Sequence, residues 1–154
     1  MNFICSVATI NLNSTNTQIN KNLLKDFINE HNIDIVFLQE VCYQDFSFVA
    51  SHNALVNIST DKKGTAVLVR KSFAYSNYLL DLSGRIVSLV VNDVNFINIY
   101  AQSGNELKRE RDRLFTENLA VHLNKPGTTN MMLGGDFNCI LEECDSKGLQ
   151  KKLL

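Results

Sequence analysis

Apolar and polar residues alternate along this chain in blocks that predict strands and helices in turn. Residues 7–12 and 33–38 are short apolar runs with the length and composition of strands. Thr15 and Gln18 have the spacing of a capping box at the start of a helix between the two runs. The apolar residues of that helix recur at helical spacing: Ile19, Leu23, Leu24, Phe27 and Ile28. We therefore expect a β-α-β unit with a right-handed crossover.

The middle of the chain contains four closely spaced runs with strand composition, at residues 54–59, 64–70, 85–91 and 94–100. Polar connectors separate them, which favours antiparallel hairpins. We place a second helix at about residues 105–123, with Ser103 and Glu106 as its capping box. Its inward-facing residues would be Leu107, Leu114, Phe115 and Leu119.

The last predicted strand covers residues 130–133 and stops at a Gly-Gly turn. The chain thus combines parallel and antiparallel strands with helices outside them, which predicts an α/β or α+β sandwich. Its 154 residues are most naturally one domain, long enough to bury a sizeable core.

The charge of the chain gives no support to a broad basic surface for nucleic acid. Lys and Arg number 15 against 16 for Asp and Glu, giving a net charge of −1. Basic and acidic residues are also interleaved along the second predicted helix, which favours a solvated face with i,i+4 pairs. A role in DNA binding must therefore rest on a local site.

The rest of the composition indicates an intracellular protein, nuclear or cytoplasmic and not secreted. We find no stretch with the length of a membrane span and no basic region followed by an apolar run at the N-terminus. The four cysteines are scattered: Cys5, Cys42, Cys139 and Cys144. Reduced, mostly buried thiols explain them better than a zinc site or a disulfide framework.

Polar side chains follow the apolar strands where catalytic chemistry needs them. Asp136 and Asn138 lie two residues apart, so on an extended backbone both point to the same side. Glu40 ends the second strand. Carboxylates from strand ends can hold Mg²⁺, and the ion acts as a Lewis acid on phosphate oxygens. Asp136 could orient the attacking water, and the Asn138 amide could stabilise the phosphoryl oxyanion.

Asn11 and Tyr100 are the remaining candidates, each at the end of a predicted strand and able to donate to phosphate. Taken singly, Asn11 is better explained as a turn residue and Tyr100 as a half-buried aromatic. All of these polar residues nevertheless occur at the carboxyl ends of predicted strands. We therefore predict that they share one rim of the sandwich.

Five ordered motifs carry a resemblance to a known superfamily, at residues 9–11, 38–40, 64–69, 98–101 and 135–138. In order and spacing they resemble the endonuclease/exonuclease/phosphatase superfamily, and the similarity runs through nearly the whole chain. The chain is most similar to the endonuclease domain of LINE-type, non-LTR retrotransposons, on the run Asn-Ile-Tyr-Ala-x-Ser-Gly and on Gly-Asp-Phe-Asn-Cys-Ile-Leu. Gly-Asp-Phe-Asn alone identifies the superfamily and not the substrate.

The resemblance implies a four-layer sandwich of two mixed sheets flanked by helices, with the active site at their shared rim. It implies that Glu40 is the main ligand of Mg²⁺, with Mn²⁺ as a substitute, and that Asn11 contacts the scissile phosphate or a metal-bound water. Tyr100 would donate to the phosphate. Asp136 would orient the nucleophile, and Asn138 would stabilise the pentacoordinate phosphoryl group. The implied substrate is DNA.

The chain departs from the family's pattern in its later part. Family members supply a late Asp and a Ser-Asp-His motif there, and none of His31, His52 and His122 follows Ser-Asp in this sequence. We therefore expect residues 1–154 to be the N-terminal portion of such a domain, with an incomplete second sheet, self-association through it, and impaired activity. The alternatives are a non-catalytic remnant or interaction module, and a phosphatase or phospholipid diesterase of the same superfamily.

Overall fold

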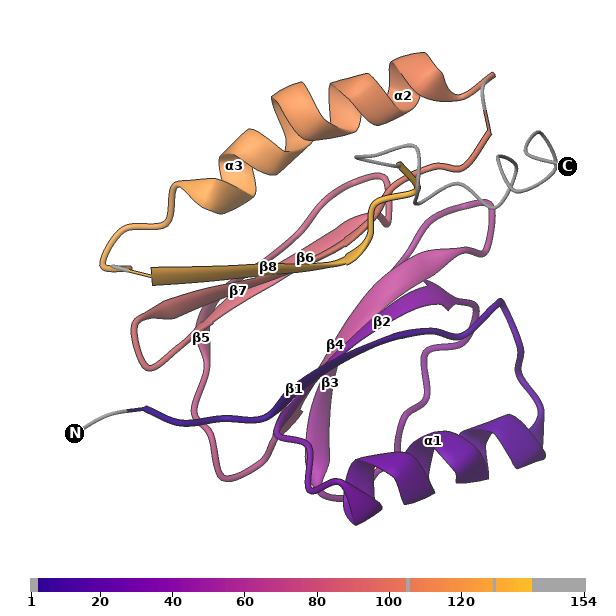
Figure 1. The fold of residues 1–154 in the computed structure, drawn as a ribbon, viewed down its shortest axis with the longest axis vertical. Coiled ribbons are helices and arrows are strands. Elements are labelled where there is room, and N and C mark those ends of the chain that lie inside the picture. The colour runs from indigo at the N-terminus through magenta and orange to yellow at the C-terminus, as the bar shows by residue number, and fades with distance from the viewer. Residues whose placement is uncertain (1–2, 105, 129, 140–154) are drawn as a thin grey trace, which may run out of the picture.

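The computed structural model describes residues 3–104, 106–128 and 130–139, which form two facing β-sheets with helices on the outer faces (Figure 1). The order of layers is α1, first sheet, second sheet, and the helical segment that begins with α2. This is the predicted four-layer sandwich. Cys144 lies outside the described residues.

The first sheet has the strand order β1-β2-β4-β3. Its strands are β1 (Val7–Asn11), β2 (Ile35–Val41), β3 (His52–Ile58) and β4 (Gly64–Arg70). β1 and β2 are parallel and are joined by α1 (Gln18–Glu30), whereas β4 is antiparallel to both of its neighbours. The predicted β-α-β unit and the hairpin that follows it are confirmed.

The second sheet has the order β5-β6-β7-β8. Its strands are β5 (Ser76–Leu80), β6 (Ile86–Val91), β7 (Val94–Tyr100) and β8 (Asn130–Asp136). Only the β7–β8 pair is parallel, so this sheet is also mixed. The sequence analysis did not predict β5, because it is an edge strand with mostly exposed residues and no apolar alternation. Within the described residues each sheet has four strands, so the second sheet has as many strands as the first.

The second predicted helix is a continuous helical segment of three parts. It consists of α2 (Lys108–Arg113), a π-helical turn η1 (Leu114–Asn118) and α3 (Leu119–Leu123). Leu114 and Leu119 are buried against the second sheet, as expected.

Both predicted capping boxes are wrong. The N-cap of α1 is Thr17, whose side chain accepts from the Asn20 N–H, while Thr15 donates to the Leu12 carbonyl. The N-cap of α2 is Leu107, which has no side-chain cap bond. Ser and Thr are common in loops as well as at caps, so spacing alone did not identify the cap.

Alternate residues of β2 pack into two separate apolar layers, which explains why nearly the whole strand is apolar. Val36 and Leu38 face α1 and pack with Leu24 and Ile28. Ile35 and Phe37 face the second sheet, in a core with residues of β6 and β7. A third core joins the outer face of β6 and β7 to η1 and α3.

Several apolar side chains on the predicted apolar face of α1 and in the last strand are exposed. On α1 only Leu24 and Ile28 are buried, whereas Ile19 is 71% and Leu23 61% exposed. β8 is an edge strand and also exposes Met131, Met132 and Leu133. No helix in the described part of the chain is long and apolar enough to cross a membrane.

His122 of α3 is buried against the second sheet, with its Nδ1 2.6 Å from the Ser88 hydroxyl. Burial lowers the pKa of His122 to about 4; Asp81 acts in the opposite direction, and Lys125 lowers the pKa further. The imidazole is therefore neutral in the folded protein at neutral pH. Its role is to satisfy a buried hydroxyl between sheet and helix.

Acidification is therefore expected to destabilise this fold. The unfolded chain protonates His122 near pH 6.5, but the folded chain does so only near pH 4, so stability falls as the pH drops through this window. The expected contribution to the free energy of unfolding is about 2–3 kcal/mol. Urea unfolding between pH 7 and 4 measures it, with a His122→Asn variant beside the wild type. A variant with the same pH dependence as the wild type would contradict this assignment.

Candidate active site

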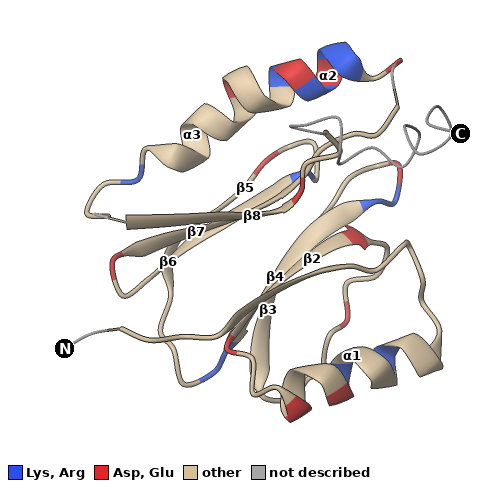
Figure 2. Cartoon of the chain, viewed as in Figure 1, with Lys and Arg blue, Asp and Glu red and all other residues tan. Residues whose placement is uncertain are grey.

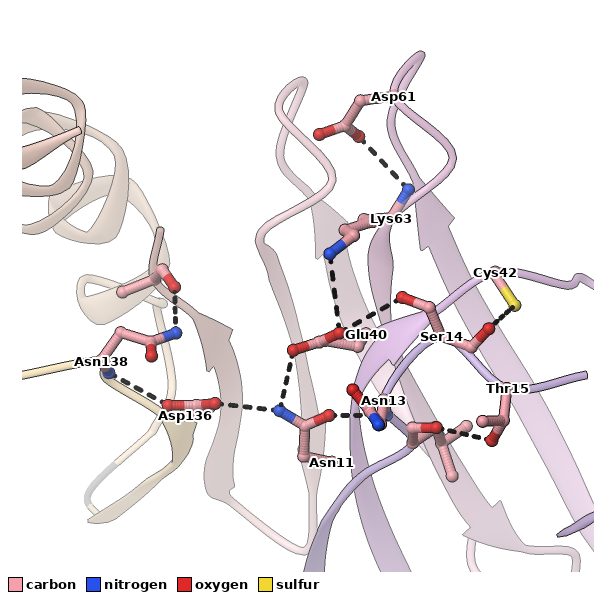
Figure 3. A network of polar contacts seen from close by, with 12 residues as sticks. Asn11, Asn13, Ser14, Thr15, Glu40, Cys42, Asp61, Lys63, Asp136 and Asn138 are labelled. Carbon is pink, nitrogen blue, oxygen red and sulfur yellow. Dashed lines mark hydrogen bonds and ion pairs between the residues drawn. The ribbon is translucent and has the colours of Figure 1, made fainter. Parts of the chain in front are cut away.

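The structure brings the predicted rim residues together between the edges of the two sheets. The Asn11 amide nitrogen donates to both carboxylates, 3.0 Å from Asp136 Oδ2 and 3.3 Å from Glu40 Oε1 (Figure 3). On its other side, Glu40 Oε2 accepts from the Ser14 hydroxyl at 3.2 Å. The Asn11 oxygen accepts the Asn13 N–H, which fixes the direction of the amide. One amide thus links a carboxylate from each sheet.

A β-bulge aims Glu40 at this rim. Gln39 is opposite Thr65 and Val41 is opposite Gly64, so Glu40 is an extra residue in β2. Its φ of 52° is in the left-handed region, which is unfavourable for a residue with a side chain. Regular alternation would have pointed Glu40 toward α1, on the same face as Leu38. The bulge turns it to the site, a common role of bulges beside active sites.

Unfavourable backbone conformations gather around the same point. Asn13, Ser14 and Asn138 also have positive φ, at 49°, 52° and 45°. Such conformations cost free energy and persist where the surrounding structure requires them, which occurs often at functional sites. All four take part in the network of Figure 3: the Ser14 hydroxyl donates to Glu40, and the backbone N–H groups of Asn13 and Asn138 donate to side chains of the site.

β8 continues through Gly134 and Gly135 to Asp136, so the predicted Gly-Gly turn is wrong. Gly135 has a φ of 129°, and a Cβ there would lie 2.0 Å from the Ile99 carbonyl oxygen. The glycine therefore permits close pairing with β7.

The Asp136 side chain then starts a turn, in place of the predicted extended backbone. Its Oδ1 accepts the Asn138 N–H at 3.0 Å, and the Asn138 amide donates to the Ala101 carbonyl at 2.7 Å. Asp136 also lies opposite Tyr100 on the parallel strand β7. Both residues of the predicted pair are thus at the rim, and Asn138 bonds to the loop after β7.

Tyr100 is only 4% exposed, so it is closer to the core than to solvent. The Arg85 guanidinium lies 4.6 Å from its ring centroid, a cation–π contact. Burial raises the pKa of the Tyr100 hydroxyl, and the negative charge of Glu40 raises it further. The phenol therefore keeps its proton at neutral pH.

A buried polar layer supports the rim from below. Gln39 Nε2 donates to Asn98 Oδ1 at 2.8 Å and to the Thr9 hydroxyl at 3.0 Å. The Asn98 amide donates in turn to the Leu38 and Ala66 carbonyls, both at 2.9 Å. Asn98 belongs to the second sheet and its acceptors to the first, so the layer joins the sheets directly beneath Glu40.

An open cavity of about 920 Å³ lies at this rim. It is lined by Thr9, Asn11, Gln39, Arg111, Gly135, Asp136, Phe137, Asn138 and Cys139. Arg111 enters the cavity from α2 and holds the loop after β7 by donating to the Gln102 and Gly104 carbonyls. Acidic and basic residues are interleaved along α2, as predicted (Figure 2), but Arg111 faces the site.

The site therefore contains more cations than the motifs indicated. Lys63 is 3.7 Å from Glu40, and Arg85 lies over Tyr100 and pairs with Asp61 at 3.1 Å. Sequence reasoning did not select these residues, because they come from hairpins whose position over the rim depends on the fold. The only local signal was Lys63 directly before the predicted strand at Gly64.

None of the three histidines reaches the rim, all of them being within the described residues. His31 caps α1, His52 is buried with its Nε2 3.0 Å from the Ile33 carbonyl, and His122 is buried on the far side of the second sheet. The thiols are less buried than predicted, since Cys5 and Cys42 are half-buried and Cys139 is exposed.

The sequence profile of the Endonuclease/Exonuclease/phosphatase family matches residues 8–153. The chain belongs to the endonuclease/exonuclease/phosphatase family. No curated protein sequence matches it significantly. The family assignment agrees with the order of the five motifs and with the position of the site at the rim of two mixed sheets.

Solved structures of endonuclease/exonuclease/phosphatase proteins share this fold at low sequence identity. TDP2 from Caenorhabditis elegans superposes with a TM-score of 0.66 and 20% identity, over 88% of this chain and 48% of that one. TDP2 from D. rerio complexed with a single-strand DNA product superposes with a TM-score of 0.67 and 16% identity, over 88% of this chain and 61% of that one. An AP endonuclease from Archaeoglobus fulgidus superposes with a TM-score of 0.67 and 15% identity, over 94% of this chain and 61% of that one. The chain thus spans about half of the length of the C. elegans protein.

Nucleases of this family generally use divalent metal ions. Within the described ranges, no three His, Cys, Asp or Glu side chains form a ready metal cluster. The donors that are present are hard oxygens, the Glu40 and Asp136 carboxylates, which both accept from the Asn11 amide nitrogen. Two carboxylates this close favour a cation between them. The set fits an ion such as Mg²⁺, which needs one or two carboxylates and keeps several waters.

Proposed function

We propose that this endonuclease/exonuclease/phosphatase protein hydrolyses phosphodiester bonds in DNA, with Mg²⁺ as its cofactor and Mn²⁺ as a substitute. The observation that carries the proposal is the Asn11 amide between Glu40 and Asp136, each carboxylate from a different sheet. Stability alone gives a fold no reason to place two carboxylates on one amide group. A phosphoryl-transfer site needs them there, beside cationic donors for the substrate.

In this proposal Glu40 is the main ligand of the metal ion, and the Asn11 amide, whose nitrogen faces the carboxylates, contacts the scissile phosphate or a metal-bound water. When bound, the ion would supply Lewis acidity to the phosphoryl group. Asp136 orients the attacking water through its carboxylate, which the Asn11 amide and the Asn138 N–H hold in place. Tyr100 keeps its proton and donates to the phosphate, and Asn138 stabilises the developing charge with its second amide hydrogen.

The charges around the cavity support a phosphate-bearing polymer as substrate. Arg111 lines the cavity, Lys63 pairs with Glu40 and Arg85 lies over Tyr100, although the chain as a whole has a net charge of −1. The motif resemblance points further, to a nicking endonuclease of a LINE-type retroelement. A DNA substrate also fits the intracellular, nuclear or cytoplasmic location expected from the sequence.

The rate is expected to be low for a nuclease. No histidine among the described residues faces the rim to act as general acid or base, and such a group contributes ~10²–10⁴-fold. The chemistry then depends on the cation, on Asp136 and on the amide and phenol donors.

Hydrolysis of two small phosphate esters tests the proposed reaction class. With Mg²⁺, bis-p-nitrophenyl phosphate, a diester, should be hydrolysed faster than p-nitrophenyl phosphate, a monoester. The reverse preference would favour the phosphatase alternative. Hydrolysis of neither ester, by protein with a cooperative unfolding transition, would favour the non-catalytic alternative.

We also propose self-association through the open edges of the sandwich. Among the described residues β8 and β1 are edge strands, and β8 exposes three apolar side chains in succession: Met131, Met132 and Leu133. An exposed apolar edge strand readily pairs with another chain. Sedimentation velocity should give a concentration-dependent mass that falls in a Leu133→Lys variant. A monomer at all concentrations would contradict this proposal.

A further inference from the structure

Lys63 contacts the Glu40 carboxylate, which the proposed metal ion would also bind. Its ammonium group lies 3.7 Å from Glu40 Oε2, on the side of Glu40 away from Asn11 (Figure 3). The Lys63 side chain is 45% exposed and that of Glu40 19%. An ion pair this open to solvent is weak and breaks readily. Lys63 is thus a resident counter-ion of Glu40 that a stronger cation can replace.

The backbone that carries Lys63 is held firmly, so only its side chain is free to move. The Lys63 carbonyl accepts from the Ser59 hydroxyl at 2.7 Å, and its N–H donates to Asp61 Oδ1 at 3.2 Å. Asp61 Oδ2 is bound by Arg85, which lies over Tyr100. The tip of the β3–β4 hairpin is therefore tied to both sheets, with Lys63 directed at the rim.

The Glu40 carboxylate cannot bind the Lys63 ammonium group and a divalent cation equally strongly at the same time. A divalent cation on this carboxylate attracts it more strongly than one ammonium group does, and it repels the ammonium group. The Lys63 side chain has a flexible four-carbon stem and three donors, so it can turn to a new anion nearby. The phosphate that shares the proposed metal ion would be the closest such anion.

We propose that Lys63 exchanges between Glu40 and the substrate phosphate. Without a divalent cation it neutralises Glu40; when the cation takes Glu40, Lys63 contacts the phosphate and positions it. Lys63 thereby couples metal binding to phosphate binding, a role that none of the sequence motifs assigns to it. This inference rests on the proposed metal-dependent function.

Mn²⁺ binding tests the first half of the exchange, with free Mn²⁺ measured by electron paramagnetic resonance. Lys63→Gln removes the competing charge, so we expect the Kd for Mn²⁺ to fall about two- to fivefold, the size of an exposed ion pair. Lys62→Gln is the matched control. It removes the same charge one residue away, and Lys62 makes no ion pair among the described residues. Equal Mn²⁺ affinities in the two variants would overturn the proposal.

Binding of a fluorescein-labelled phosphorothioate duplex, followed by anisotropy, tests the second half. With Mn²⁺ present, Lys63→Gln should weaken DNA binding about fivefold, whereas with EDTA its affinity should equal that of Lys62→Gln. The same loss with and without metal would overturn the exchange, because Lys63 would then be a constant DNA contact.

These outcomes separate the exchange from the proposed function. Mn²⁺ and DNA binding need no turnover, so a protein that shows both Lys63 effects but hydrolyses no diester would lose only the proposed activity. A protein that hydrolyses diesters with unchanged Mn²⁺ affinity in Lys63→Gln would lose only the exchange. A wild type that binds no Mn²⁺ would overturn both.

Discussion

Replacing Glu40 with Gln should lower the rate of phosphodiester hydrolysis at least about 100-fold, because the metal's Lewis acidity is worth several kcal/mol. Gln keeps the shape of the side chain and can still accept from the Ser14 hydroxyl. It loses the negative charge that the metal ion requires. The initial rate with bis-p-nitrophenyl phosphate and Mg²⁺ is the measurement.

Glu30→Gln is the matched control for this change. Glu30 is an exposed residue at the end of α1, so the substitution alters net charge equally without touching the rim. Its rate should stay within about twofold of the wild type, as expected for a surface substitution. If Glu40→Gln also kept a rate within a few-fold of the wild type, the carboxylate would not be the metal ligand.

Replacing Asn98 with Ala should cost at least about 3 kcal/mol of unfolding free energy, the largest stability effect that we expect. The side chain is fully buried and makes three hydrogen bonds between the sheets. Without it, the Leu38 and Ala66 carbonyls and the Gln39 amide each lose a partner in a region without solvent. Urea unfolding measures the loss.

Asn22→Ala provides the comparison for that measurement. Asn22 is exposed on α1 and accepts one hydrogen bond, from the Gln18 amide. We expect a change within about 0.5 kcal/mol for this surface position. A loss below about 1 kcal/mol for Asn98→Ala would contradict the view that this residue joins the two sheets beneath the site.

Local patterns predicted the strands that carry the site and the rim on which it lies. Val36 and Leu38 alternate with Ile35 and Phe37, and both sets are apolar because both faces of β2 are covered. The polar residues that end β1, β2, β7 and β8 then meet, because paired parallel strands end at the same edge.

The remaining features depend on contacts between residues far apart in the sequence. The bulge at Glu40 is set by the register of β2 against β4, and β5 forms because β6 offers it an edge. Asn98 reads as an ordinary polar residue in a strand until the second sheet covers it. Lys63 joins the site only through a hairpin tip held by Asp61.

Nicking of supercoiled plasmid DNA tests the central claim, that this rim is a metal-dependent phosphodiesterase site, most directly. The protein would be incubated with plasmid and Mg²⁺, then with EDTA, then with Mg²⁺ restored, beside Glu40→Gln purified in the same way. We predict slow conversion to the open-circular form that stops with EDTA, resumes with Mg²⁺ and is absent in the variant. Folded wild-type protein that leaves the plasmid supercoiled, or nicks it equally well without Glu40, would contradict the claim.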